Sequence, residues 1–325
     1  MRIRRLAFVA FIAALASCVQ AQAQTSTPPW PQRAVRIIVG FQPGSATDIT
    51  ARLFGERLST RWGKPVVIDN RPGPDGLVAV GGFAGARDDH TLLFSIGGPI
   101  TINPLIHEKL PYDPERDLVP IVSASDSFLA IAANAALGID NIDALAKRAK
   151  AEPGKLNWAA TPGLPQFAFA GFIASGQLDL VQVSYRDFTP ALSDLGEGRI
   201  SVAVTSVVAL LPLVRAEKVK LLTLTNRMRS PAVPEVPTAH EAGYPALAVD
   251  GFQGFFGWRD MPDDLRDRIA EDVRAVAADP AVAERLAGIG QALRVGTTAE
   301  FVAMIDEQRA KIAGIARDIG LKPQP

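Results

Sequence analysis

The chain has 325 residues, of which 48% are hydrophobic and 21% charged, so it can bury a large core and more than one lobe. This composition excludes a disordered or low-complexity protein. Basic and acidic residues number 34 each, which leaves no net charge to hold a polyanion, and we expect no nucleic-acid partner.

The N-terminal segment is typical of a signal peptide. Three arginines among the first five residues precede a short apolar run at residues 6–16, which is too short to span a bilayer. Two cleavage sites compete. The Ala-Gln-Ala segment at residues 21–23 suits an ordinary signal peptidase and is the one we favour, whereas cleavage before Cys18 would give a lipoprotein. The sequence therefore predicts export to the periplasm, with residues 1–23 as the signal peptide. Cys18 is the single cysteine, so no intramolecular disulfide can form.

The rest of the chain alternates short apolar runs with amphipathic segments. In chain order, strands are predicted at residues 35–39, 65–68, 91–94, 119–123, 127–132, 156–160, 180–184, 200–204 and 220–225. Helices are predicted at 49–62, at 77–86, and over most of 263–319. Strands that alternate with helices predict mostly parallel sheets covered by helices on both faces.

These elements form two successive sets, which predicts two α/β lobes. No flexible Gly/Ser or charged tract separates the sets, and this favours lobes joined by short crossing strands. We expect residues 24–125 and 248–325 to form one lobe and residues 126–247 to form the other.

Residues with catalytic or metal-binding chemistry are sparse. His90, His107 and His240 lie in separate loop-like segments without a carboxylate or cysteine at ligand spacing, so no metal site is predicted. No Gly-x-Ser-x-Gly elbow, Walker-type loop or His-Glu-x-x-His helix is present in the sequence. Asp88 and Asp89 are adjacent acids in a polar loop, which is more typical of a solvated turn than of a catalytic pair. We therefore predict a protein that is not an enzyme and needs no cofactor.

Two loops of small residues each follow a predicted strand and precede a predicted helix. In the first, residues 41–48, free backbone amides and the helix dipole favour an anion; alternatively, Thr47 or Asp48 merely caps the helix. The second loop, residues 159–163, precedes a helix that begins near Pro165. If the two loops face each other across a cleft, neutral amides can hold a carboxylate.

Four segments of the sequence resemble the Bug (Bordetella uptake gene) family of periplasmic binding proteins, the receptor components of tripartite tricarboxylate transporters. Residues 39–48 (VGFQPGSATD) are similar to the family's V-P-F-x-P-G-G-x-x-D loop, and residues 66–73 (VVIDNRPG) to its V-V-V-E-N-R-P-G segment. Residues 110–120 (LPYDPERDLVP) are similar to L-P-Y-D-P-x-x-D-F-x-P, and residues 229–243 (RSPAVPEVPTAHEAG) to R-S-P-x-x-P-x-V-P-T-x-x-E-A-G. The segments follow the family's order and span nearly the whole mature chain.

The resemblance implies a type II periplasmic-binding fold, in which two α/β lobes joined by crossing strands close around a small carboxylate. It also implies delivery of this ligand to the membrane permease subunits of a tripartite tricarboxylate transporter, and we expect the receptor to be a monomer. A sensory binding protein that presents its ligand to a membrane-bound regulator would use the same cleft and stays an alternative. An exported hydrolase or isomerase would need a nucleophile or an acid–base pair, which the sequence does not show.

By position, the resemblance implies a set of ligand-binding residues on both sides of the cleft. They are Phe41, Pro43, Gly44, Ser45, Ala46, Thr47 and Asp48, with Gly97, Gly98 and Phe252 as further walls, and Ala160, Thr161, Gly163, Gln166, Tyr185 and Thr205 from the other lobe.

The second loop departs from the family pattern, because Pro162 interrupts it and no histidine follows. The loss of hydrogen-bond donors there predicts a monocarboxylate with an apolar or aromatic body. Trp158, Phe167 and Phe188, near these loops, form either lobe core or an apolar wall.

Overall fold

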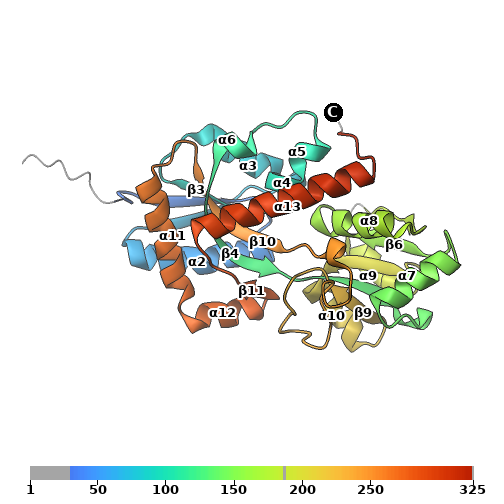
Figure 1. Ribbon diagram of the computed structural model, residues 1–325. Coiled ribbons are helices and arrows are strands. Elements are labelled where there is room, and N and C mark those ends of the chain that lie inside the picture. Colours follow the sequence, from blue (N-terminus) through green and yellow to red (C-terminus); the bar gives the residue numbers. More distant parts are fainter. Residues whose placement is uncertain (1–29, 186–187, 324–325) are drawn as a thin grey trace, which may run out of the picture.

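The computed structural model describes residues 30–185 and 188–323 and shows two α/β lobes side by side (Figure 1). Among these residues, the first sheet has six strands in the order β11-β4-β10-β3-β1-β2, with bounds β1 Val35–Val39, β2 Val66–Asn70, β3 Thr91–Ile96, β4 Leu118–Ser127, β10 Gly251–Trp258 and β11 Gln291–Leu293. The second sheet has five strands in the order β7-β6-β8-β5-β9, with bounds β5 Leu129–Asn134, β6 Asn157–Ala160, β7 Val181–Gln182, β8 Val202–Ser206 and β9 Val219–Leu224. The predicted pair of α/β lobes is therefore confirmed.

Helices cover the faces of both sheets. The α-helices are α2 Ala46–Trp62, α3 Leu77–Ala86, α4 Gly98–Thr101, α5 Asn103–Ile106, α6 Pro114–Asp117, α7 Ile142–Ala151, α8 Leu164–Gly176, α9 Phe188–Gly196, α10 Val207–Arg215, α11 Asp263–Ala277, α12 Pro280–Ala287 and α13 Thr298–Asp318, and the 3-10 turns are η2 Pro74–Gly76, η3 Ala135–Leu137 and η4 Pro245–Leu247. Within the part of the chain that the structure describes, no helix is both long and apolar enough to cross a membrane. The predicted signal peptide and Cys18 lie outside the described residues.

The expectation of mostly parallel sheets is wrong. Only β1 with β2 and β3, and β6 with β7 and β8, pair in parallel, whereas β10 and β11 in the first sheet and β5 in the second pair antiparallel. Strands β10 and β11 were not predicted. Strand β10 is buried on both faces, so it shows no alternation of polar and apolar residues, and Gly254 interrupts its apolar run. This glycine is needed because a Cβ there would lie 2.4 Å from the ring of Phe301 on α13.

Two crossing segments join the lobes. A single residue, Phe128, separates β4 of the first sheet from β5 of the second, and residues 225–250 carry the chain back to β10. The buried side chain of Asn226 ties these segments together, because its Oδ1 accepts the Leu129 N–H at 3.0 Å and its Nδ2 donates to the Ser127 carbonyl at 2.9 Å. The crossing strands expected from the sequence are present. The lobe boundaries after residues 125 and 247 stay a prediction.

Helix α13 belongs to the first lobe and packs against α8 of the second (Figure 1). Gly171 on α8 permits this close approach, because a Cβ at this position would lie 2.9–3.2 Å from three carbons of Ile315 on α13. Lobe contact at this helix pair is therefore sensitive to a single methyl group.

We expect Gly171→Ala to lower the free energy of unfolding by about 1–3 kcal/mol, because overpacking outweighs the gain in helix propensity. Gly314→Ala is a matched control within α13, since its Cβ would meet only the Arg317 guanidinium at 3.8 Å. This control should gain up to about 1 kcal/mol. Urea denaturation measures both changes, and equal stabilisation of the two variants would contradict the tight packing of α8 on α13.

Candidate functional site

A cleft of about 980 Å³ lies between the lobes, at the carboxyl ends of the parallel strands β1, β2 and β3. The first lobe contributes the loops that follow these strands, and the second contributes the loop after β6 and the start of α8. The lining residues are Gly40, Phe41, Gln42, Pro72, Gly73, Asp75, Gly76, Ile96, Gly98, Pro99, Ile102, Asn103, Ile106, His107, Thr161, Pro162, Gly163, Gln166, Phe167, Ala170, Gln182, Ile319, Leu321 and Lys322. Loops at the carboxyl ends of parallel strands are a common place for ligands in α/β proteins.

Apolar side chains from both lobes form much of the cleft wall. Phe167 on α8 lines the cleft and packs against Ile102 and Ile312, which belong to the first lobe. Of the three aromatic residues singled out in the sequence, only Phe167 is a wall residue. Trp158 lies in the core of the second lobe, and Phe188 packs against that core. The cleft can therefore surround an apolar ligand body.

The first predicted loop is organised by its own carboxylate. Asp48 is 2% exposed, and its side chain accepts the Gly44 N–H at 2.8 Å, the Asn70 amide at 2.7 Å and the Arg52 guanidinium at 3.0 Å. Burial favours the neutral acid, but these hydrogen bonds outweigh it and lower the pKa of Asp48. The Ser45 hydroxyl caps α2 by accepting the Asp48 N–H at 3.2 Å.

The hydrogen bonds within the first loop use the backbone N–H groups of Gly44 and Asp48, which the sequence suggested were free to bind a ligand. Of the loop residues predicted to bind, Phe41 lines the cleft, whereas Pro43, Gly44, Ser45, Ala46, Thr47 and Asp48 are not among its lining residues. Gln42 lies in the predicted loop but was not named as a ligand-binding residue, and it lines the cleft as well. The ligand-binding role of residues 43–48 stays a prediction.

The second predicted loop opens directly into the cleft. Thr161 is fixed by its N–H, which donates to the Val204 carbonyl at 3.0 Å, and by a 2.7 Å hydrogen bond between its hydroxyl and that of Thr205. Gly163, with φ 89°, turns the chain into α8. Thr161, Gly163 and Gln166 line the cleft, whereas Ala160 ends β6 and Thr205 lies buried behind Thr161.

The first turn of α8 presents backbone amides at the cleft. The amides of a helix's first turn have no partner within the helix, and Pro165 has no N–H, so the N–H groups at this end are those of Gly163, Leu164 and Gln166. Gly163 and Gln166 line the cleft, and Leu164 lies between them in the chain. The helix dipole adds partial positive charge at the same place. Lys322, near the C-terminus, lines the same cleft and brings a further positive charge.

The remaining predicted residues divide between wall and core. Gly98 lines the cleft. Gly97 is packed so closely that a Cβ would lie 2.3 Å from Gln308 and 2.9 Å from Phe252, which is itself 1% exposed in the first lobe's core. The Tyr185 hydroxyl donates to Asp194 at 2.6 Å, and burial together with this hydrogen bond raises the pKa of Tyr185 to about 12. Tyr185 is not among the lining residues.

Sequence reasoning missed the polar residues Asp75, Asn103, His107 and Gln182, which also line the cleft. The first three follow β2 and β3, whose carboxyl ends lie beside that of β1. Strand order would have pointed to these loops, but it could not be read from the sequence.

Two further polar clusters lie outside the cleft. Ligand atoms of Asp88, Asp89 and His90 lie within 4.8 Å of one another, contrary to the expectation that no carboxylate lies near a histidine. Arg33 donates to both aspartates, at 2.6 and 2.9 Å, and His90 Nε2 accepts the Gln32 N–H at 3.0 Å. Burial favours the neutral form of Asp88, but the Arg33 and Thr91 hydrogen bonds lower its pKa to about 2. These internal bonds favour a structural role, and the absence of a metal stays a prediction.

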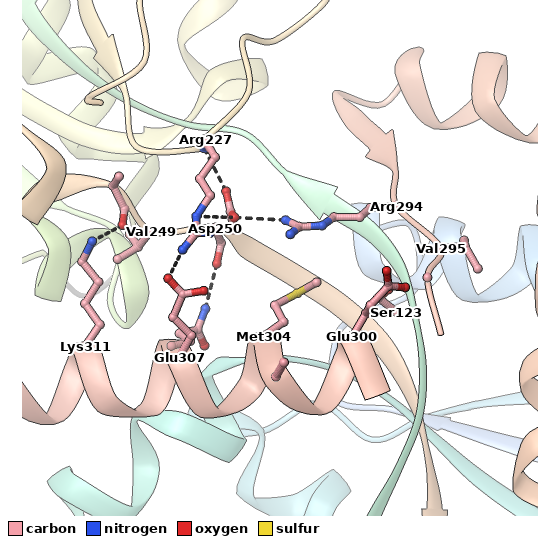
Figure 2. A pocket seen from close by; sticks show the side chains of 14 residues that line it. Ser123, Arg227, Val249, Asp250, Arg294, Val295, Glu300, Met304, Glu307 and Lys311 are labelled. Carbon is pink, nitrogen blue, oxygen red and sulfur yellow. Dashed lines mark hydrogen bonds and ion pairs between the residues drawn. The ribbon is translucent and has the colours of Figure 1, made fainter. Parts of the chain in front are cut away.

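The other cluster surrounds a cavity of about 480 Å³ where α13 passes the crossing segments (Figure 2). Arg294 donates to Asp126 at 2.7 Å and to Asp250 at 3.0 Å, while Arg227 pairs with Asp250 and Glu307. Figure 2 shows the side chains of Arg227, Asp250, Arg294 and Glu307 pointing toward one another. We call this set of ion pairs the crossover cluster; it joins the crossing segments to α13 and β11.

The fold and the cleft together define a class of protein. Two α/β lobes, joined by crossing strands and enclosing a cleft, form the type II periplasmic-binding fold of solute-binding proteins. An R. palustris protein solved with adipate superposes with a TM-score of 0.77 and is 25% identical, covering 91% of this chain and 100% of that one. The chain belongs to the family described as "Tripartite tricarboxylate transporter family receptor", whose profile matches residues 50–321.

Sequence relatives agree with this assignment. A UPF0065 protein of Bordetella bronchiseptica is 31% identical over 307 residues, covering 93% of this chain and 89% of the relative. Protein BugT of Bordetella pertussis is 27% identical over 304 residues, covering 92% and 93%. The resemblance to the Bug family is thus confirmed. Members of this family are substrate-binding receptors, and the solved relatives include periplasmic binding proteins.

Proposed function

We propose that this protein is a periplasmic receptor that captures a small carboxylate in the cleft between its lobes and delivers it to the membrane subunits of a tripartite tricarboxylate transporter. It acts as a monomer and performs no catalysis. The observation that supports the proposal most directly is the start of α8 at the cleft. Gly163 and Gln166 line the cleft there, and their amides, the amide of Leu164 between them and the helix dipole favour an anion. A signal peptide at residues 1–23, or a lipid on Cys18, would place the receptor outside the cytoplasm.

The proposed ligand is a monocarboxylate with an apolar or aromatic body. Phe41, Ile102, Ile106 and Phe167 offer such a body apolar contact, and the second loop contributes Pro162, which has no amide donor. The R. palustris protein was solved with adipate, a dicarboxylate, so the proposed ligand differs from adipate in having a single carboxylate.

A thermal-shift panel tests the proposal. Benzoate-like and branched aliphatic acids should raise the melting temperature, because a ligand at about 100 times its Kd stabilises the folded state by about 2.7 kcal/mol. Citrate, malate and glutamate should have little effect. Stabilisation by these polycarboxylates alone would overturn the ligand class but not the receptor. Mass spectrometry should recover the bound acid unchanged, and any turnover would contradict a purely binding role.

A further inference from the structure

Asp75 and His107 meet in the cleft although they are far apart in the sequence. Asp75 lies in the turn η2 after β2, and His107 follows α5. The His107 Nε2 atom lies 3.4 Å from the Asp75 carboxylate Oδ2. This Nε2 atom is shielded from solvent and has no hydrogen-bond partner within the described part of the chain. Both residues line the cleft, and a ligand group that enters between the imidazole and the carboxylate would supply the partner that Nε2 lacks.

The pair is held in place by buried polar residues. Asp75 adopts a left-handed conformation, with φ 49° and ψ 19°, which is unusual for a residue other than glycine. Its carbonyl accepts a hydrogen bond from Asn103 Nδ2 at 2.8 Å, and Asn103 also donates to the Tyr112 hydroxyl at 3.0 Å. Tyr112 in turn donates to the Pro99 carbonyl at 2.8 Å, and Asn103 and Tyr112 are 2% and 4% exposed. A buried network therefore fixes a strained aspartate at the cleft wall, which is typical of a preorganised binding position.

The chemistry of the pair selects a ligand group. The Asp75 carboxylate accepts hydrogen bonds and repels a second carboxylate, while the imidazole nitrogen of His107 can accept or donate one. A hydroxyl can donate to Asp75 and accept from His107, and an ammonium can donate to both.

We propose that Asp75 and His107 form a specificity subsite for a hydrogen-bond donor, a hydroxyl or an ammonium group, at the far end of a monocarboxylate ligand. The subsite also excludes dicarboxylates. This proposal rests on the carboxylate capture proposed above and adds the identity of the ligand's second polar group.

Two ligand series that differ only at the far end test the subsite. The first is hexanoate, 6-hydroxyhexanoate, 6-aminohexanoate and adipate, and the second is benzoate, 4-hydroxybenzoate, 4-(aminomethyl)benzoate and terephthalate. Calorimetry on the mature protein should show that a donor-bearing acid binds about 10-fold or more tightly than its unsubstituted parent, and that the dicarboxylate binds more weakly than the parent. The hydroxyl and ammonium arms identify which donor the site takes.

Substitutions of Asp75 and His107 test whether these two residues cause the preference for donor-bearing acids. Asp75→Asn should remove most of the donor advantage and strengthen dicarboxylate binding about 10-fold, because the repulsive charge is gone. Asp260→Asn is the matched control, since Asp260 also has a left-handed backbone, with φ 64°, and does not line the cleft. His107→Gln should reduce the donor advantage, with the exposed His240→Gln as its control. Melting curves without ligand check that all variants fold.

The outcomes separate the two proposals. If dicarboxylates bind the wild-type protein as tightly as the donor-bearing acids, or if Asp75→Asn leaves the ratios unchanged, the subsite is overturned while carboxylate capture stands. If no acid in either series binds, carboxylate capture itself fails, and the subsite fails with it.

Discussion

Between pH 4 and pH 7, the Asp126→Asn variant should gain about 2 kcal/mol in free energy of unfolding relative to the wild-type protein. Asp126 is 3% exposed near the end of β4 and belongs to the crossover cluster through its ion pair with Arg294. Burial raises the pKa of Asp126 to about 6, and the neighbouring Asp250 acts in the same direction. The Arg294 guanidinium lies 2.7 Å from the Asp126 carboxylate and lowers its pKa, but this attraction does not cancel the cost of burying the charge.

The direction of this pH dependence follows from proton binding. Because the folded-state pKa of Asp126 is raised, the folded protein binds a proton at a pH where the unfolded chain has already released it. The resulting stabilisation is fully present below the unfolded pKa near 4 and is lost as the pH rises through about 6. Asparagine does not titrate, so only the wild-type protein loses this contribution.

Urea denaturation of both proteins at pH 4, 5, 6 and 7 measures the difference. Other carboxylates, such as Asp48 with its lowered pKa, give both proteins the same opposite trend, and this trend cancels in the comparison. Asp260→Asn provides the control for an exposed aspartate. A stability difference between wild type and Asp126→Asn that stays constant with pH would show that Asp126 titrates normally.

Leu164→Pro should weaken binding of the carboxylate ligand about 10- to 100-fold. A hydrogen bond to a charged group contributes about 1.5–3 kcal/mol, and each 1.4 kcal/mol is a factor of ten in Kd. Proline removes the N–H of the first helical residue of α8 but suits the backbone at that position. The substitution therefore deletes one of the three amide donors that we propose for the carboxylate, the one between the lining residues Gly163 and Gln166.

Leu164→Ala is the matched control, because both variants lose the leucine side chain that packs against the second lobe's core and only one loses the amide. Calorimetry compares the affinities of the two variants for the acid from the panel that binds the wild-type protein most tightly. Equal affinities would show that the Leu164 amide does not contact the carboxylate, and the anchor would then have to be sought at the first loop.

Much of the secondary structure could be predicted from residue patterns. Strand β1 is a run of β-branched and apolar residues, and α3 follows the turn signal after β2, so both were found at their observed positions. Strand β10 was missed because it is buried on both faces and carries Gly254 at the position where α13 packs. The same omission contributed to the wrong expectation for the first sheet, since β10 is the antiparallel strand between β3 and β4. In the second sheet, β5 was predicted, but its antiparallel direction was not.

Within the candidate site, the sequence located a loop correctly where the strand before it and the helix after it could both be predicted. The small-residue loop before α8 was expected at the cleft, and Thr161, Gly163 and Gln166 do line it. The first loop was also recognised, but its sequence could not show that the Asp48 side chain binds Gly44, Arg52 and Asn70. Tyr185 and Phe252 were carried over by position, and neither lines the cleft in this structure.

The sequence by itself determined the alternation of strands and helices, the two lobes, the two small-residue loops and the family, because each of these is written in residues that are close along the chain. Tertiary structure alone decided that Asp75 meets His107, that Asp126 is buried against Arg294, and that Phe167 is a wall of the cleft. These contacts depend on how elements far apart along the chain are brought together in space, and periodicity and local propensity carry no information about that.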